Sequence, residues 1–167
     1  MIGDYTINTA KDFYNTCVEL DFKNFIIWGG NYFLSFLPFS ASWIVWDKRG
    51  DMNSNNFADG EMAWTNIKTR IRIYKQLWNG MIREGESGKR IHPTQKPIMT
   101  LEKILNDFTK EKEIIFDGFL GSGSTLIASE KTNRICYGME LEPKYIDVII
   151  TRWEEYTGNK AVLLNGD

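Results

Sequence analysis

Apolar residues in the first third of the chain recur at the spacings of two kinds of element. Residues 9–20 place them at helical spacing, and Thr9 is a suitable N-terminal cap, so we expect a helix there. Residues 24–28 and 42–46 are short apolar runs rich in β-branched and aromatic side chains, which predicts two buried strands. Residues 31–37 are expected to form one or two helical turns.

The middle of the chain contains two loop patterns on either side of a strand pattern. Residues 50–60 are polar and rich in turn-forming residues, and residues 79–92 contain three glycines, so both are expected to be loops. Between them, isoleucines alternate with polar or amphipathic residues: Arg70, Ile71, Arg72, Ile73 and Tyr74. This alternation predicts a half-buried strand whose isoleucines face the core.

The last 75 residues are more regular and alternate strand and helix patterns. Helices are expected at residues 97–109, 122–131 and 143–156, and strands at residues 111–116, 134–139 and 161–165. A β-α-β-α-β alternation is typical of a parallel sheet with helices on its faces, so the predicted fold class is α/β.

Composition narrows the class of protein. A chain of 167 residues fits one domain over residues 1–167, and its net charge of −2 excludes a generally basic nucleic-acid binder. One histidine, His92, and two distant cysteines, Cys17 and Cys136, predict neither a zinc site nor a disulfide framework. Neither a membrane span nor a signal peptide is recognisable, so we expect a reduced, cytoplasmic protein with no membrane partner.

The stretch IIFDGFLGSGSTLIA carries the most chemical information. A predicted strand ends at Asp117, and Gly121 and Gly123 allow close approach of a ligand to the amino end of the next helix. Glu140 follows Gly121 by 19 residues, at the end of the next strand, where an acid can accept hydrogen bonds from both ribose hydroxyls. This geometry suits a nucleoside-containing ligand, and the alternative is an ordinary tight turn between a strand and a helix.

The identity of that ligand is narrowed by charge. No lysine follows the glycines, which excludes a phosphate-binding P-loop, and the carboxylate of Asp117 would repel a pyrophosphate. S-adenosylmethionine carries ribose hydroxyls, an ammonium group and a sulfonium but no phosphate, and it therefore fits better than NAD. The alternative hypothesis, a dinucleotide-binding dehydrogenase, is disfavoured by Asp117 and also because no hydride-transfer site is recognisable.

Several segments together resemble one protein family. The motifs HPTQKP (92–97), FDGFLGSGSTLIA (116–128) and YGMELEPKYIDVIITRWEEYTG (137–158) are similar to the C-terminal half of the DNA amino-methyltransferases, in the permuted order that places the cofactor loop last. FIIWGGNYF, WIVWDK and NNFADGEMAWT resemble central segments of the same family, particularly of its phage and prophage members. The resemblance covers about residues 20–161.

This resemblance implies a Rossmann-like three-layer sandwich that binds S-adenosylmethionine and acts on double-stranded DNA. Residues 50–91 would be a short target-recognition region and residues 92–167 the cofactor-binding half. By matching position, the cofactor would be held by Thr94, Gln95, Asp117, Gly118, Phe119, Gly121, Ser122, Gly123 and Glu140. No metal is implied. The family usually has proline where Gly118 stands, a change expected to loosen the turn by up to about 1 kcal/mol.

The family's catalytic motif, Asp/Asn/Ser-Pro-Pro-Tyr/Phe, is not present, since the sequence contains no adjacent prolines. It would precede the helix expected at 9–20, and nothing in residues 1–8 suggests a replacement strand. We therefore assign no catalytic residue and expect a truncated or split enzyme that is inactive alone. In the family's sheet, the strand that carries this motif lies between the strands expected here at 24–28 and 111–116. Either these two strands pair directly, or another chain or an upstream segment fills the central position between them; an oligomer is possible.

Two residues at strand ends are candidate substitutes for the missing motif. Asn31 and Asp47 each follow a predicted strand, where α/β sites form. The favoured interpretations are structural: a helix cap for Asn31 and a surface ion pair between Asp47 and Lys48.

A cluster of cations provides the candidates for contact with DNA. Arg70, Arg72 and Lys75 are the cations, and the interleaved aromatic residues Trp64, Tyr74 and Trp78 would stack on bases. The alternative is a strand with a solvated basic face.

The resemblance thus implies methyl transfer from S-adenosylmethionine to the exocyclic amino group of adenine or cytosine in DNA, in the setting of restriction-modification. The alternative is an inactive, methyltransferase-like subunit that binds a cofactor or a partner.

Overall fold

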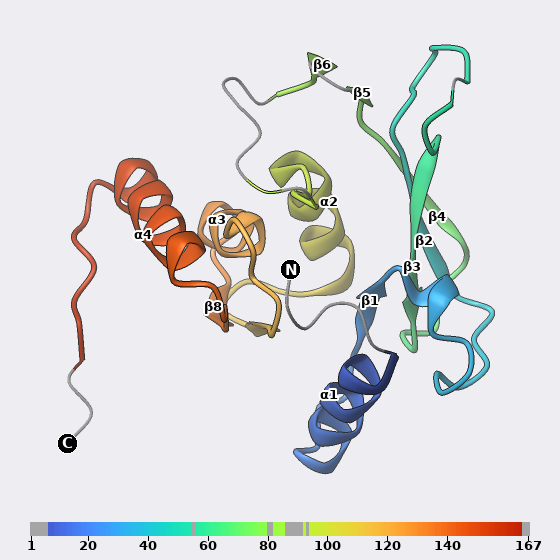
Figure 1. Ribbon diagram of the computed structural model, residues 1–167, viewed down its shortest axis with the longest axis horizontal. Helices are drawn as coiled ribbons and strands as arrows, with labels where there is room; N and C mark the ends of the chain where they lie inside the picture. Colours follow the sequence, from blue (N-terminus) through green and yellow to red (C-terminus); the bar gives the residue numbers. More distant parts are fainter. Residues whose placement is uncertain (1–6, 55, 80–81, 86–91, 93, 165–167) are drawn as a thin grey trace. The chain divides into compact units, whose positions relative to one another are not determined.

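A computed structural model of the chain describes residues 7–54, 56–79, 82–85, 92 and 94–164 (Figure 1). The chain divides into two units, residues 1–82 and 83–167, and each is described by itself. Helices and strands are both present, as the predicted α/β class requires, but they alternate regularly only in the second unit.

The first unit is built around a four-stranded sheet. Its strands are β1 (Ile26–Trp28), β2 (Trp43–Asp47), β3 (Gly60–Thr65) and β4 (Arg72–Lys75), in the order β1-β3-β2-β4. Strand β3 is antiparallel to β1 and β2, whereas β4 is parallel to β2. Strands β1, β2 and β4 therefore run in one direction. We call the edge where they end the carboxyl edge and the opposite edge the amino edge.

The helical elements of this unit pack through aromatic side chains. Helix α1 (Ile7–Glu19) places Tyr14 against the ring of Trp64, with ring centroids 6.2 Å apart. The short 3-10 helix η1 (Gly30–Tyr32) also lies against this tryptophan, because a Cβ added to Gly30 would be only 2.4 Å from the Trp64 Cβ. The helix expected at 9–20, the strands at 24–28 and 42–46 and the helical turns expected at 31–37 are thus confirmed in outline. The expected cap is wrong, because α1 already includes Ile7 and Thr9 therefore lies inside the helix.

The strand expected near residue 72 is present, but its buried face is the opposite of the predicted one. Ile71 and Ile73 are 60% and 63% exposed, whereas Tyr74 and Trp78 are buried. The larger aromatic surfaces decide the orientation, since Tyr74 pairs with Trp46 across the sheet and the rings of Trp46 and Trp78 lie 5.9 Å apart. Past β4, the short strands β5 (Trp78–Asn79) and β6 (Ile82–Arg83) pair with each other. The rest of the loop expected at 79–92 lies mostly outside the described residues.

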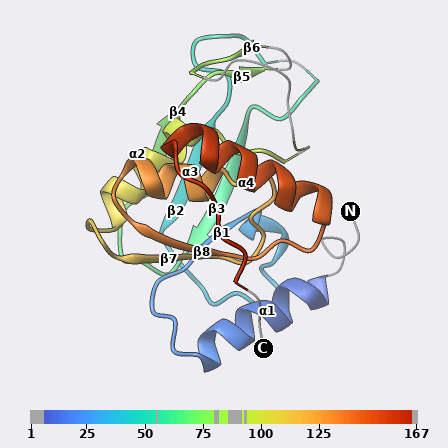
Figure 2. The same ribbon diagram turned by 90° about the vertical axis from the view of Figure 1, so that its left-hand side faces the viewer.

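The second unit confirms most of the predicted alternation. Its elements are α2 (Ile98–Phe108), β7 (Ile114–Asp117), α3 (Ser124–Lys131), β8 (Ile135–Gly138) and α4 (Pro143–Thr157). Strands β7 and β8 are parallel, and helix α3 lies between α2 and α4 and against β8 (Figure 2). Buried Leu101, Ile104, Ile127 and Ile149 join the three helices.

The strand expected at residues 161–165 is not formed over the described residues 161–164. Helix α4 ends at Gly158, whose φ of +72° turns the chain, and the carboxylate of Glu154 then accepts hydrogen bonds from Lys160 Nζ at 2.8 Å and from the Ala161 backbone N–H at 2.9 Å. These contacts direct the segment away from β8, and Val162, Leu163 and Leu164 are 78–86% exposed.

The strands expected on either side of the missing motif strand, β1 and β7, each lie at the end of a sheet. Strand β1 pairs with β3, and β7 pairs with β8. Both expected arrangements, direct pairing of the two strands and a position filled by a further segment, stay predictions.

We predict that Gly30→Ala lowers the free energy of unfolding by about 1–3 kcal/mol, because the added methyl group overlaps Trp64. Urea denaturation would measure the change. The matched control is Asn31→Ala, since the neighbouring Asn31 is exposed, and it should change the stability by less than about 0.5 kcal/mol. Equal effects of the two variants would contradict the packing argument.

A second prediction concerns Cys136 on β8. Burial raises the pKa of its thiol to about 11, and the nearby charge of Asp117 acts in the same direction. Because the thiolate is the reactive form, alkylation at about pH 8 should be roughly 10- to 100-fold slower in the folded chain than in urea. Peptide mass spectrometry would follow Cys136 separately from Cys17. Asp117→Asn should speed the reaction, and equal rates in folded and unfolded chains would refute the proposed environment.

Candidate functional site

The glycine turn between β7 and α3 is the centre of the candidate site. Gly121 and Gly123 have φ values of +56° and +78°, which side-chain-bearing residues rarely adopt. Gly123 caps helix α3, and its N–H donates to the carbonyl oxygen of Leu120 at 2.8 Å. The turn therefore brings the backbone to the amino end of a helix without a side chain in the way.

Glu140 closes this turn from the neighbouring strand. Its Oε2 accepts the Gly121 N–H at 2.8 Å, and its Oε1 accepts the Glu142 N–H at 2.9 Å. Asp117, at the end of β7, accepts the Phe119 N–H on Oδ1 at 2.9 Å. Two carboxylates thus flank one backbone turn, and each oxygen keeps a second lone pair for a ligand.

The HPTQKP segment reaches the same turn through His92. The imidazole is buried, lies 4.3 Å from the Tyr145 ring between centroids, and is 3.5 Å from where a Gly121 Cβ would be. Its Nδ1 accepts the Thr94 N–H at 3.2 Å, and its carbonyl oxygen accepts the Gln95 N–H at 3.1 Å. Sequence reasoning placed Thr94 and Gln95 near the cofactor but missed His92, although the residue begins the motif.

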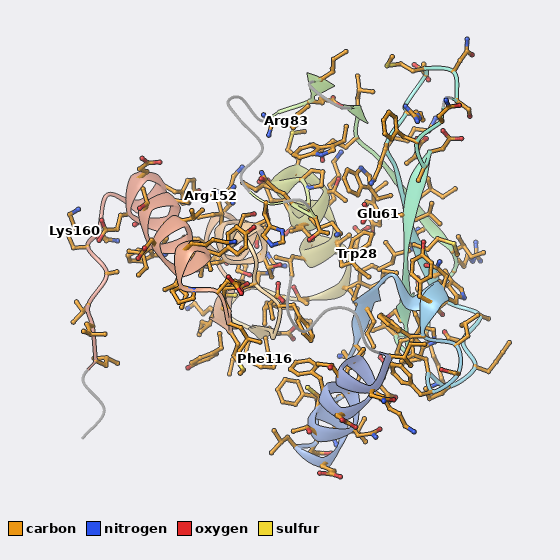
Figure 3. The ribbon with its side chains drawn as sticks, in the orientation of Figure 1. Trp28, Glu61, Arg83, Phe116, Arg152 and Lys160 are labelled. Atoms are coloured by element: carbon orange, nitrogen blue, oxygen red, sulfur yellow. The ribbon has the colours of Figure 1, made fainter. Side chains whose placement is uncertain are left out.

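Helix α4 holds the other side of the turn. Arg152, labelled in Figure 3, donates from Nη1 to the carbonyl oxygen of Ser122. Ile149 lies 3.2 Å from where a Gly123 Cβ would be, so only glycine fits without displacing α4. His92, Glu140 and Arg152 therefore fix the backbone of the turn independently of any ligand.

The remaining residues predicted to bind the cofactor differ in their exposure to solvent. Phe119 is 50% exposed, Gly118 is half-buried, and the side chain of Ser122 is buried beside Ser124, with the two Oγ atoms 3.5 Å apart. Phe119 is thus available to a ligand, whereas Ser122 contributes through its backbone. Among the described residues, no group of three metal-ligating side chains is present. No described helix is long and apolar enough to cross a membrane.

The three cations predicted to contact DNA do not lie at the same edge of the sheet. Arg70 and Arg72 line a groove at the amino edge, whereas Lys75 pairs in register with Asp47 at the carboxyl edge. The aromatic residues proposed to stack on bases, Trp64, Tyr74 and Trp78, are at most 8% exposed, so that expectation is wrong. Their surfaces are used by the core of the first unit.

The two strand-end polar residues also differ from expectation. Asp47 accepts the backbone N–H groups of Arg49 and Gly50 on Oδ1, and Lys48 forms its ion pair with Glu61, the residue labelled on β3 in Figure 3. The expected Asp47–Lys48 pair is therefore replaced, because Glu61 lies across the sheet from that end of β2. Asn31 lies inside η1, and Gly29 occupies the cap position.

Comparison with known proteins identifies the family. A family model described as DNA methylase matches residues 1–151. The type II methyltransferase M2.LlaDCHI of Lactococcus lactis subsp. cremoris is 32% identical over 111 residues, covering 65% of this chain and 40% of the relative. The chain spans 40–46% of the length of the first three curated relatives.

Solved structures agree with this assignment. The M1.HpyAVI–SAM complex is 27% identical, with a TM-score of 0.56 over 78% of this chain and 74% of the neighbour. PvuII DNA methyltransferase (cytosine-N4-specific) shares the fold at 15% identity, with a TM-score of 0.63 over 92% of this chain and 73% of the neighbour. The chain belongs to the DNA methylase family, the N6 and N4 amino-methyltransferases.

Proposed function

We propose that the second unit binds S-adenosylmethionine and serves methyl transfer to an exocyclic amino group of adenine or cytosine in double-stranded DNA. The observation that carries the proposal is the hydrogen bond from the Gly121 N–H to Glu140, which joins the glycine turn of one strand to the acid of the next. Family membership supports the same reaction, and the named M1.HpyAVI–SAM complex supports the same cofactor.

The residues around the turn fit this cofactor. The positive φ values of Gly121 and Gly123 set the tight turn that precedes helix α3, and the half-buried carboxylates of Asp117 and Glu140 match a ligand with hydroxyl groups and positive charge. Glu140 would accept from the ribose hydroxyls. Asp117 would face the ammonium group, Phe119 would contact the adenine, and Thr94 and Gln95 would lie near the methionine end. When bound, the cofactor supplies an electrophilic methyl group on a sulfonium.

This chain's own contribution is therefore binding and orientation. The turn is already fixed by His92, Glu140 and Arg152, so little backbone ordering is needed on binding. Activation of the target amino group requires hydrogen bonds that the family obtains from its Pro-Pro-aromatic motif, and this sequence contains no adjacent prolines. We propose that a further segment, on the same or another chain, supplies that motif. We also propose a cytoplasmic location.

The second candidate function is a methyltransferase-like subunit that binds a cofactor or a partner without turning over. The absence of adjacent prolines is the observation that favours it.

We predict that the chain binds S-adenosylmethionine in calorimetry and that Asp117→Asn and Glu140→Gln each weaken binding by roughly 10-fold or more. Hydrogen bonds to charged groups contribute about 1.5–3 kcal/mol each, and both variants remove the charge with little change of shape. Glu155→Gln, an exposed change on α4, is the matched control and should retain the affinity. A folded chain that does not bind S-adenosylmethionine would contradict the assignment of the site.

We further predict that the purified chain alone transfers no isotope-labelled methyl group to duplex DNA. Adding a segment that carries an Asp-Pro-Pro-Tyr motif should restore transfer, because such a motif holds and activates the target amino group. A segment with alanine in place of the aspartate is the control. Transfer by the chain alone would refute the proposal of a missing motif, and no transfer with either segment would favour the non-catalytic subunit.

A further inference from the structure

A groove at the amino edge of the first unit has no role in the proposed cofactor site. Its volume is about 840 Å³, and its lining comes from α1, the segment 38–42, the end of β3 and the approach to β4. Three cations line it: Lys68, Arg70 and Arg72. No acidic residue is among its lining residues, and within the described part of the chain none of the three cations forms an ion pair or a hydrogen bond. Three unpaired positive charges gathered in a chain of net charge −2 indicate an anionic ligand.

The walls of the groove are fixed by hydrogen bonds from three side chains that are buried or half-buried. Trp64 Nε1 donates to the carbonyl oxygen of Pro38 at 2.9 Å, and Ser40 Oγ donates to that of Thr65 at 2.6 Å. Ser42 Oγ donates to the Thr69 carbonyl oxygen at 2.9 Å and accepts the Thr69 N–H at 3.1 Å. The backbone segments that carry the cations and the opposite wall are thereby held together before any ligand binds. Such preorganisation reduces the entropic cost of binding.

One aromatic side chain of the groove is not buried by this packing. Phe39 lines the groove and is 96% exposed, although its neighbours Trp43 and Trp64 are fastened by their indole N–H groups to Ser40 and Pro38. An isolated exposed phenylalanine gains nothing from the fold, but a flat ring beside unpaired cations can stack on a base whose phosphates the cations neutralise.

We propose that this amino-edge groove binds a single nucleic-acid strand, with Lys68, Arg70 and Arg72 on the phosphates and Phe39 stacked on an unpaired base. The aromatic ring favours a nucleic-acid strand over an acidic peptide, which would use the charges but not the stacking surface. An unpaired base is specified because bases inside a duplex do not offer their faces to a side chain. Lys75, at the carboxyl edge, takes no part in this site. The inference does not depend on the cofactor site.

The test is fluorescence anisotropy with a labelled single-stranded oligothymidylate of about 12 nucleotides, at salt concentrations between about 50 and 200 mM. Combining Arg70→Ala with Arg72→Ala should weaken binding and reduce the slope of log affinity against log salt by about 1.4, since each lost phosphate contact contributes about 0.7. Phe39→Ala should weaken binding roughly fivefold or more, and Phe39→Trp should retain it.

The controls separate this groove from general charge attraction. Combining Lys103→Ala with Lys110→Ala removes the same charge from exposed positions of the second unit and should leave the affinity within about twofold. Phe39, Arg70 and Arg72 are exposed, so their substitution should leave the melting temperature unchanged. Equal losses in the groove and control variants would overturn the proposal.

Two further outcomes would also overturn it. If a duplex of the same length binds as tightly as the single strand and ignores Phe39→Ala, base stacking is refuted. If an oligoglutamate with the same net charge as the oligothymidylate displaces it from the groove, the occupant is an acidic peptide. Calorimetry with S-adenosylmethionine on the same variants should give unchanged affinity, so a failure here is distinguishable from a failure of the proposed cofactor site.

Discussion

The hydrogen bond from the Gly121 N–H to the Glu140 carboxylate is the contact on which the second unit depends. It joins the turn after β7 to the residues after β8, and the adjacent ladder continues it, because the Met139 N–H donates to the Asp117 carbonyl oxygen and the Leu120 N–H to that of Met139. A positive φ at Gly121 is what points its N–H at the acid. The positive φ therefore favours glycine at this position whether or not a ligand is bound, and the His92 ring lies 3.5 Å from where its Cβ would be.

The elements of the second unit were predictable because the residues that begin and end them are recognisable from the local sequence. Proline before α2, glycines before α3 and a clear change from strand to helix spacing locate each element without knowledge of its neighbours. The orientation of β4 was not predictable in this way. Aliphatic alternation favoured burial of Ile71 and Ile73, but the choice was made by Tyr74 and by the contact of Trp46 with Trp78, which depends on pairing between distant strands.

The residues of the candidate site also divide into those with a local sequence signal and those that depend on contacts between distant elements. Asp117, Gly121, Gly123 and Glu140 were identified because strand-end acids and glycines carry a signal in their spacing. His92 and Arg152 were not, since each acts by packing or hydrogen bonding on the turn from an element remote in sequence. The stacking role expected of Trp64 and Trp78 failed for a related reason: a large aromatic residue near cations has the same sequence signal whether it faces solvent or the core. Phe39 is distinguished from them only by its exposed fraction, and it lies outside the basic strand, where the sequence pattern gives no signal for it.

Strands of both units expose apolar side chains. On β7 and β8, Ile114, Ile135 and Tyr137 are 48–66% exposed, and on or beside β4 so are Ile71 and Ile73, at 60–63%. A folded chain gains free energy by covering such side chains, and unpaired strand edges add hydrogen-bonding groups that favour a further strand. The cofactor turn does not share this need, because His92, Glu140 and Arg152 all come from the second unit. Under our proposal, cofactor binding would need only residues of the second unit, whereas methyl transfer would also need a Pro-Pro-aromatic motif, and the sequence contains no adjacent prolines.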